Sequence, residues 1–327
     1  MQKHLVSICV PTYNRAFSLA RFLETFLTNL AASGSRECQL CVSDNASSDG
    51  TMKILERYAG RHEHIKWGRN AENLGFGRNL YAAARLADGD YVYFCGDDDL
   101  LREDALPLLV LFAKKQNDLI LFNSFPGAKV KKSGMVNGQT LNLANAAEYF
   151  KRLGTFHASF IGNLFFRRET FLGIDPGSAL SLSAYPHMVP VFKMLARGGV
   201  LFVNAPAVDY TDSQRSWKPL QPIYTSIDMA RLITGSVDWT GTPWLKQSVY
   251  AQLLRSLPRA IWRSNSNQTP DYPNNPYGSV SLQNILEVYK PSQWCAALGA
   301  TLALVLPIIA AARGWQNKVA TNKPISQ

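Results

Sequence analysis

Short apolar runs alternate with longer amphipathic stretches through the first hundred residues, and this alternation restricts the fold more than any other feature. Strands are predicted at 6–10, 40–43, 65–67 and 91–95, with helices beginning near 19, 51 and 80. Pro11 is expected to end the first strand, because proline has no N–H to donate to a sheet. This β-α-β-α order predicts an α/β fold with a mainly parallel sheet and helices on both faces.

The chain has 327 residues, enough for one large α/β domain with additions. We expect that domain at 1–217, with a first half at 1–100 and a more strand-rich second half at 101–217. A helical C-terminal extension is predicted at 218–290, and an apolar, membrane-associating helical segment at 291–315.

The stretch from Trp294 to Ala312 contains no charged residue and approaches the length that spans a bilayer. Basic residues lie on both sides of it, at Lys290 and from Arg313 onward, which does not fit a simple span. Pro307 would kink such a helix. Three alternatives stay open: a helix that re-enters or lies on the membrane, a spanning helix, and a buried helix of a globular domain.

The formal net charge of +10 favours anionic partners, such as nucleotide phosphates or an anionic membrane surface. Nucleic acid is not expected, because no dense run of Lys and Arg is interleaved with aromatic residues. Cys38 and Cys41 form a C-x-x-C pair, but no second pair follows at the spacing of a zinc site. Residues three apart in a strand face opposite sides, so both are predicted to be core cysteines.

Three adjacent carboxylates, Asp97, Asp98 and Asp99, follow the fourth predicted strand. A divalent cation would relieve their mutual repulsion, and oxygen ligands suit Mg²⁺ or Mn²⁺. The alternative is an exposed acidic turn that caps a helix starting near Leu100. Parallel sheets bind ligands at the carboxyl ends of their strands, which favours a metal site that serves a diphosphate.

Two more polar segments follow predicted strands. Asp44 ends the second strand and is the ligand-binding candidate in the turn 44–51, where Asp and Asn side chains could bond the edge of a base. Ser47, Ser48 and Asp49 are expected only to turn the chain and cap a helix. Residues 70–77 are predicted to form a loop in which glycines permit close backbone approach, and Arg78 directly after it can bond a phosphate. Neither the G-x-G-x-x-G fingerprint nor a phosphate-binding P-loop occurs.

In this order the motifs resemble glycosyltransferase family 2, whose GT-A fold is a Rossmann-like sheet with flanking helices. The resemblance rests on Pro11-Thr12-Tyr13-Asn14-Arg15, the turn 44–51, Asn73-Leu74-Gly75 with Asn79, and the acidic triplet. It implies metal ligands at Asp97, Asp98 and Asp99. It further implies a nucleotide-sugar site made of Pro11, Thr12, Tyr13, Asn14, Arg15, Asp44, Asn73, Gly75, Arg78, Asp97, Asp98 and Arg215.

Members of this family generally invert the anomeric centre, and a base on the protein deprotonates the acceptor hydroxyl. The acidic pair that supplies this base in many members is absent, and His187 stands in the corresponding stretch. Together with 160–164 and Arg168, His187 resembles the subgroup that includes bacterial O-antigen abequosyltransferases. His187 is therefore the candidate base, since the ordinary pKa of histidine is about 6.5, and it joins Asp99 as a candidate catalytic residue.

Asp175 and Asp209 are the reserve candidates for the base. The later segment 212–217 contains Arg215 and Trp217, but it is not the Q-x-x-R-W of processive synthases. We therefore expect transfer of a single sugar to a saccharide acceptor, carried on a polyprenyl diphosphate. The expected setting is O-antigen or capsule synthesis at the cytoplasmic face of a bacterial inner membrane.

Two other functions remain open at this point. A nucleotidyltransferase that makes activated sugars would share the sheet and the metal site. Such enzymes usually place a Gly-rich loop directly after the first strand, where this chain has residues 11–15 without a glycine. A catalytically inert, membrane-bound sugar-binding or scaffold protein is the alternative from another class.

Overall fold

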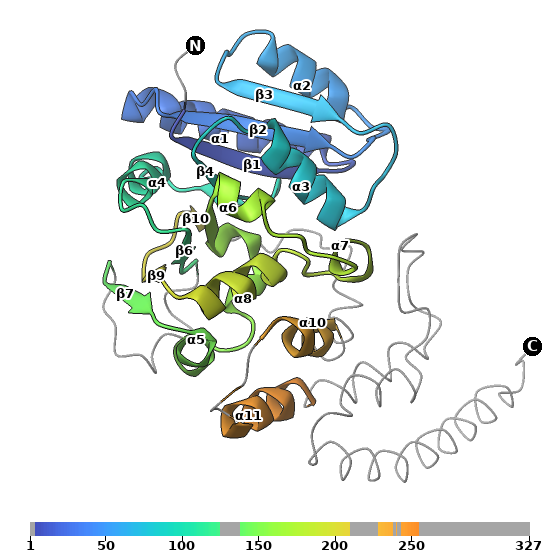
Figure 1. The fold of residues 1–327 in the computed structure, drawn as a ribbon. Helices are drawn as coiled ribbons and strands as arrows, with labels where there is room; N and C mark the ends of the chain where they lie inside the picture. Colours follow the sequence, from blue (N-terminus) through green and yellow to red (C-terminus); the bar gives the residue numbers. More distant parts are fainter. Residues whose placement is uncertain (1–3, 125–137, 210–227, 238–239, 241–242, 255–327) are drawn as a thin grey trace, which may run out of the picture.

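The computed structural model describes residues 4–124, 138–209, 228–237, 240 and 243–254, and helices cover both faces of one central sheet (Figure 1). The first half alternates strands and helices, as predicted. Its elements are β1 (Val6–Thr12), α1 (Ala16–Ser33), β2 (Cys38–Asp44), α2 (Thr51–Ala59), β3 (Ile65–Arg69), α3 (Phe76–Leu86) and β4 (Tyr91–Phe94).

The second half mixes short strands and short helices. Its first elements are β5 (Leu100–Leu101), α4 (Ala105–Ala113), β6 (Leu119–Phe122), β7 (Thr140–Leu143), α5 (Ala146–Arg152) and two 3-10 turns, η2 (His157–Ser159) and η3 (Ile161–Asn163). They are followed by β8 (Leu164–Arg167), α6 (Arg168–Leu172), α7 (Ala179–Leu182), α8 (Met188–Arg197), β9 (Val200–Val203) and β10 (Val208–Asp209). Two helices of the predicted extension are described, α10 (Met229–Ser236) and α11 (Pro243–Leu254).

The main sheet has eight strands in the order β3-β2-β1-β4-β8-β6-β9-β7. The pairs β3-β2, β2-β1, β1-β4 and β6-β9 are parallel, while β8 is antiparallel to both β4 and β6, and β7 is antiparallel to β9. The sheet is thus mainly parallel, as predicted, and one sheet runs through both predicted halves. A separate two-stranded sheet pairs β10 with β5.

Two hydrophobic clusters, one on each face of the sheet, make up the core. Leu80 and Tyr81 of α3 belong to one cluster, whereas Leu19 and Phe22 of α1 belong to the other. The cysteines follow the same division, since Cys41 lies in the first cluster and Cys38 in the second. The four cysteines among the described residues are buried and free, which confirms the prediction of core thiols.

Two predicted boundaries were wrong. β1 continues through Pro11 to Thr12, because its pairing with β4 ends at Cys9 and only β2 lies beside it beyond that point. A strand with one neighbour tolerates a missing N–H. Helix α3 begins at Phe76, although Gly77 was assigned to a loop. A Cβ at Gly77 would lie 2.7 Å from the carbonyl oxygen of Leu180, so glycine allows α3 to pack closely against α7.

The acidic triplet does not cap a helix. β5 follows it directly and α4 begins only at Ala105, so the capping alternative was wrong. Within the described ranges, no helix has both the length and the hydrophobicity to cross a bilayer. The predicted membrane segment at 294–312 and the end of the helical extension lie outside the described residues.

Candidate active site

The residues that follow β1, β2, β3 and β4 lie together along the edge of the sheet that is formed by the carboxyl ends of these strands. Thr12 and Asp44 are register partners at the ends of β1 and β2. The backbone N–H of Asn70, directly after β3, donates to the carbonyl oxygen of Asp44 at 2.9 Å. Asp97 follows β4 and contacts Thr12. The predicted meeting of these polar segments at the carboxyl ends of the strands is confirmed.

Asp97 is held at this edge by Thr12. The Thr12 hydroxyl donates to Oδ2 of Asp97 at 2.6 Å, and both residues are buried. Burial raises the pKa of Asp97 from its ordinary value to about 7, although the Thr12 hydrogen bond and the charge of Arg15 lower it. Asp97 therefore exchanges its proton near neutral pH, and a positive charge placed beside it would favour the ionised form.

Asp98 and Asp99 converge over Gly96. A Cβ at Gly96 would lie 2.9 Å from Oδ2 of Asp99 and 3.0 Å from Oδ1 of Asp98, so the missing side chain makes room for both carboxylates. Oδ2 of Asp98 also forms an ion pair with Arg15 at 3.1 Å. The triplet therefore separates into two neighbouring carboxylates and Asp97, which turns toward Thr12.

This arrangement suits a divalent cation that shares its ligands with a substrate. Within the described part of the chain, no group of three His, Cys, Asp or Glu residues is placed to hold a metal ion. Magnesium usually takes one or two carboxylates and completes its shell with water and phosphate oxygens. Asp98 and Asp99 meet that requirement, whereas the predicted set of all three carboxylates is not gathered in one place.

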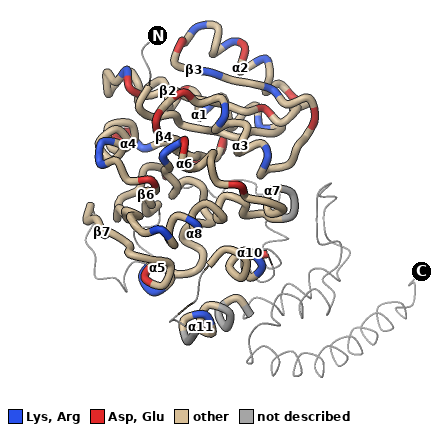
Figure 2. The backbone as a smooth tube through the Cα atoms, in the orientation of Figure 1, with Lys and Arg blue, Asp and Glu red and all other residues tan. Residues whose placement is uncertain are grey.

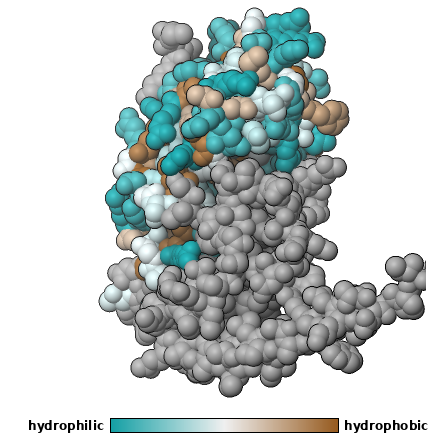
Figure 3. Space-filling model, turned by 90° about the vertical axis from the view of Figure 1, so that its right-hand side faces the viewer, coloured by the Kyte–Doolittle hydropathy of each residue, from teal (hydrophilic) through white to brown (hydrophobic). Residues whose placement is uncertain are grey.

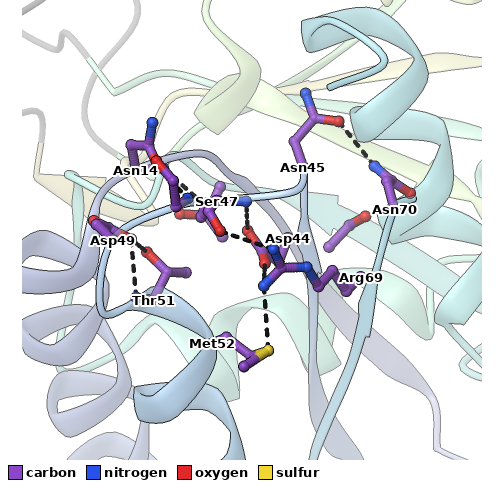
Figure 4. Close-up of polar contacts among 12 residues, drawn as sticks. Asn14, Asp44, Asn45, Ser47, Asp49, Thr51, Met52, Arg69 and Asn70 are labelled. Carbon is purple, nitrogen blue, oxygen red and sulfur yellow. Dashed lines mark hydrogen bonds and ion pairs between the residues drawn. The ribbon is translucent and has the colours of Figure 1, made fainter. Parts of the chain in front are cut away.

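Asp44 is fully buried, and within the described part of the chain it uses one of its two carboxylate oxygens in a hydrogen bond. Oδ1 accepts from the backbone N–H of Ser47 at 3.1 Å. Oδ2 has no hydrogen-bond partner among the described residues and lies 3.5 Å from Nη1 of Arg69 (Figure 4). Arg69 was not among the predicted site residues, although its place at the end of β3 is a signal that could have identified it.

The loops after β1 and β2 are joined to each other. The backbone N–H of Asn14 donates to the Ser47 hydroxyl, and the Asn14 side chain accepts from the backbone N–H of Ser48, both at 2.8 Å (Figure 4). Asp49 accepts from the backbone N–H groups of Ala16 and Thr51, the first residues of α1 and α2. The predicted turning and capping role of this segment is confirmed.

A cluster of asparagine amides ties the loop after β3 to the same edge. The Asn45 amide donates to Asn73 at 2.7 Å, and the Asn70 amide donates to Asn45 and Asn79, both at 2.9 Å. Asn73 in turn accepts from the backbone N–H of Gly75 at 3.0 Å. The predicted donor residues Asn73 and Gly75 thus shape the loop. Asn45 and Asn70 were missed, although the density of asparagine at 70–79 pointed to Asn70.

The other predicted donor residues lie near this edge or outside the described chain. Tyr13 is 44% exposed directly after β1, and Pro11 is buried within the strand. Arg78 lies on the surface of the first turn of α3. Arg215 lies outside the described residues.

His187 is buried at the start of α8. Its Nε2 lies 3.1 Å from the carbonyl oxygen of Ser159, which can only accept, so Nε2 carries the proton in this contact. Nδ1 has no hydrogen-bond partner in the described part of the protein. Burial lowers the pKa of His187 to about 4, although contacts with the carbonyl groups of Ser159 and Ala158 raise it. The ring is neutral at pH 7, and the edge of Phe76 from α3 packs against it.

The reserve candidates for the base are both exposed. Asp209 forms an ion pair with Arg102 at 2.9 Å. Its strand β10 pairs with β5, which directly follows the acidic triplet. Asp175 accepts from the backbone N–H of Gly177 at 2.8 Å. Arg168, which belongs to the motifs of the subgroup, donates from Nε to the carbonyl oxygen of Gly89 at 3.0 Å. This contact supports the fold.

Comparison with known proteins agrees with this geometry. A sequence profile of the family described as "Glycosyl transferase family 2" matches residues 7–173, just over half of the chain. The abequosyltransferase RfbV of Salmonella typhimurium is 29% identical over 222 residues, which cover 62% of this chain and 66% of that protein. The poly(ribitol-phosphate) β-N-acetylglucosaminyltransferase TarP of Staphylococcus aureus is 30% identical over 36% of this chain and 35% of its own. The chain thus spans less than two-thirds of the length of these relatives.

The fold is also found among solved structures. The crystal structure of residues 1–349 of TarS from S. aureus superposes with a TM-score of 0.59 and 17% identity, over 87% of this chain and 80% of that one. At this identity the likeness concerns the fold alone, and it agrees with the expected GT-A sheet. Because the profile match extends from β1 through α6 and includes the acidic triplet, the chain belongs to glycosyl transferase family 2.

Proposed function

We propose that the protein transfers a single sugar from a nucleotide-sugar donor to a saccharide acceptor during the synthesis of a bacterial surface polysaccharide. The acceptor in this proposal is linked to a polyprenyl diphosphate, and the reaction inverts the anomeric centre. The observation that carries the proposal is the meeting of Asp44, Thr12 and the carboxylates 97–99 at one edge of the sheet.

The relatives support a nucleotide-sugar donor and a polysaccharide product. One is an abequosyltransferase, another is a poly(ribitol-phosphate) glycosyltransferase, and TarS has been solved in complex with UDP-GlcNAc. In our proposal Oδ2 of Asp44, which accepts no hydrogen bond from the described residues, accepts one from an N–H of the nucleobase. Arg69, 3.5 Å from this oxygen, lies beside it to donate to a neighbouring carbonyl of the nucleobase. Thr12, with its hydroxyl on Asp97, lines the path from the base to the diphosphate.

Charge at the leaving diphosphate is the second element of the proposal. Arg15 pairs with the carboxylate of Asp98 at 3.1 Å, and Arg21 donates to the backbone carbonyl oxygen of Asp98 at 3.5 Å, so two cations already lie beside this residue. A Mg²⁺ or Mn²⁺ ion held by Asp98 and Asp99 would neutralise charge that develops on the leaving diphosphate.

His187 is the proposed base, with Asp209 and Asp175 as the alternatives. Its neutral ring keeps a lone pair on Nδ1, the atom without a partner among the described residues. The buried site disfavours the charged ring, so a proton taken from the acceptor must be stabilised or passed on. Phe76, the first residue of α3, packs against the His187 ring and is itself 39% exposed. One partly exposed side chain therefore lies between His187 and solvent.

The proposed location is the cytoplasmic face of a bacterial inner membrane. The net charge of +10 and the uncharged stretch 294–312 support contact with an anionic bilayer. In the described part, Lys and Arg are interspersed with Asp and Glu (Figure 2), and the coloured atoms in Figure 3 mix hydrophilic and hydrophobic residues without one continuous hydrophobic area among them. The proposed membrane contact therefore rests on the C-terminal segment and the net charge.

A thermal-shift panel with UDP, GDP, CDP and dTDP, each with and without Mn²⁺, tests the donor site. We expect one nucleotide to stabilise the protein in a metal-dependent manner, by about 3 kcal/mol at a hundredfold excess over its Kd. Asp99→Ala should abolish this stabilisation. Glu63→Ala is the matched control, because the Glu63 side chain is 92% exposed. Glu63 precedes the start of β3, at the end of the strand away from the proposed site.

Either outcome is informative. Stabilisation by one nucleotide that survives in Glu63→Ala and disappears in Asp99→Ala would support the donor site and name the nucleotide. A folded protein that responds to none of the four would sink the donor site and favour a non-catalytic scaffold.

A further inference from the structure

Asn79 lies at the point where the pairing of β1 with β2 ends. Its side-chain amide donates to the carbonyl oxygen of Thr12 at 3.3 Å and to that of Ser43 at 3.1 Å, one carbonyl on each strand. Asn79, the fourth residue of α3, is only 2% exposed, so this helix reaches the ends of the strands through a buried polar group. A buried amide of this kind persists only where its hydrogen bonds are made.

The orientation of the Asn79 amide is fixed by a second asparagine. The amide nitrogen of Asn70 donates to Oδ1 of Asn79 at 2.9 Å, so only the NH₂ group of Asn79 can face the two carbonyls. Asn70 is itself anchored, because its backbone N–H donates to the carbonyl oxygen of Asp44. The chain of amides therefore connects the ends of three strands.

The two carbonyls belong to the backbone that carries the proposed donor contacts. Thr12 holds Asp97 through its hydroxyl, and Ser43 directly precedes Asp44. The distance between Asp44, which is proposed to contact the nucleobase, and Asp97, which lies nearer the diphosphate, thus depends on how β1 and β2 end relative to each other. Asn79 is the side chain that bonds both ends.

We infer that Asn79 is a positioning residue that sets the spacing between the nucleobase contact at Asp44 and the diphosphate side at Thr12 and Asp97. This inference rests on the proposed donor site and assigns the residue that keeps its two parts in register. Asn79 acts through the backbone, without contacting the donor itself. Small displacements of binding groups are costly, because a rigid ligand cannot follow both parts at once.

The test is the affinity of the full-length protein for whichever of UDP, GDP, CDP or dTDP binds the wild type, measured by titration calorimetry. Asn79→Leu removes both hydrogen bonds at similar volume, and we expect binding to weaken about tenfold. Tyr81→Phe is the matched control on α3. It removes a buried hydroxyl that has no hydrogen-bond partner among the described residues, so affinity should stay within about twofold of the wild type.

A second variant guards against loss of folding. Asn70→Ala changes a half-buried residue and frees the Asn79 amide to rotate, so it should weaken binding about threefold. A purely structural role would lower the unfolding midpoint and leave the Kd of the folded protein unchanged. If Asn79→Leu or Asn70→Ala folds and binds the nucleotide with wild-type affinity, the inference is overturned while the donor site stands. A wild type that binds none of the four nucleotides would instead overturn the donor site on which it rests.

Discussion

Asp44 and Asp97 are buried carboxylates a short distance apart at the same sheet edge, yet their surroundings differ. Asp97 accepts from a hydroxyl, and burial dominates its proton affinity. Asp44 has an arginine beside its second oxygen. In the proposed reaction the two carboxylates have different tasks, since Asp44 faces an uncharged nucleobase and Asp97 lies nearer to the diphosphate of the donor. The difference in their neighbours matches that division of roles.

The raised pKa of Asp97 predicts how stability depends on pH. The folded state binds this proton more tightly than the unfolded state, so stability is highest at acid pH and falls as pH rises from about 4 through about 7. Asp97→Asn removes this titration. Between pH 5 and pH 8, without divalent metal, the wild type should lose about 2.5 kcal/mol more unfolding free energy than Asp97→Asn. Urea titrations at both pH values measure it, and parallel pH profiles would refute the prediction.

Helix α3 connects the two halves of the site. Its first turn carries Arg78, Asn79 and the close contact of Gly77 with α7. Phe76 at its start packs against His187. One helix therefore contacts the strand ends on one side and the candidate base on the other, so its packing affects both.

Gly77→Ala tests this packing. A Cβ there would lie 2.7 Å from the carbonyl oxygen of Leu180 and 2.8 Å from Cγ of Pro186, so we expect a loss of about 1 to 3 kcal/mol in unfolding free energy. Gly235→Ala in α10 is the control, because nothing lies within 4 Å of its added Cβ. There the better helix propensity of alanine should add up to about 1 kcal/mol. Urea denaturation measures both, and equal effects of the two substitutions would show that α3 has room to move.

The elements of the first half were predictable because their signals are local. The apolar run at β2, the alternating faces of Cys38 and Cys41, and the helical spacing in α1 depend on near neighbours in the chain. The continuation of β1 through Pro11 was not predictable, since it depends on where β4 stops. The hydrogen bonds of Asn79 likewise involve residues 36 and 67 positions away in sequence.

At the scale of the whole molecule, the site occupies one edge of a sheet that continues through the second half of the chain. The place of β8 was beyond sequence reasoning, because a run of three apolar residues followed by an arginine does not show which strands it will separate or in which direction it will run. The motifs of the site were predictable because they lie in the locally encoded half.

Membrane association is the prediction that belongs to the whole chain. The double substitution Leu302→Arg with Leu306→Arg should weaken binding to vesicles that contain phosphatidylglycerol at least about tenfold, because each arginine in an apolar environment costs about 3 kcal/mol. Gln316→Arg with Asn317→Arg adds the same charge outside the apolar stretch and should bind at least as well as the wild type. Cosedimentation measures both, and equal binding of the two variants would argue against a role for this stretch.

The insertion of β8 between β4 and β6 has a consequence for synthesis on the ribosome. The strands β1 to β4 are contiguous in the chain and can pair with one another as soon as they emerge. Among the described strands, the partners of β6 are β8 and β9, both of which are translated later. At about 5 to 20 residues per second, β4 keeps an open edge for roughly 4 to 15 seconds before β8 arrives. During that interval the nascent chain presents an unpaired strand, the kind of surface that chaperones protect and that aggregation exploits.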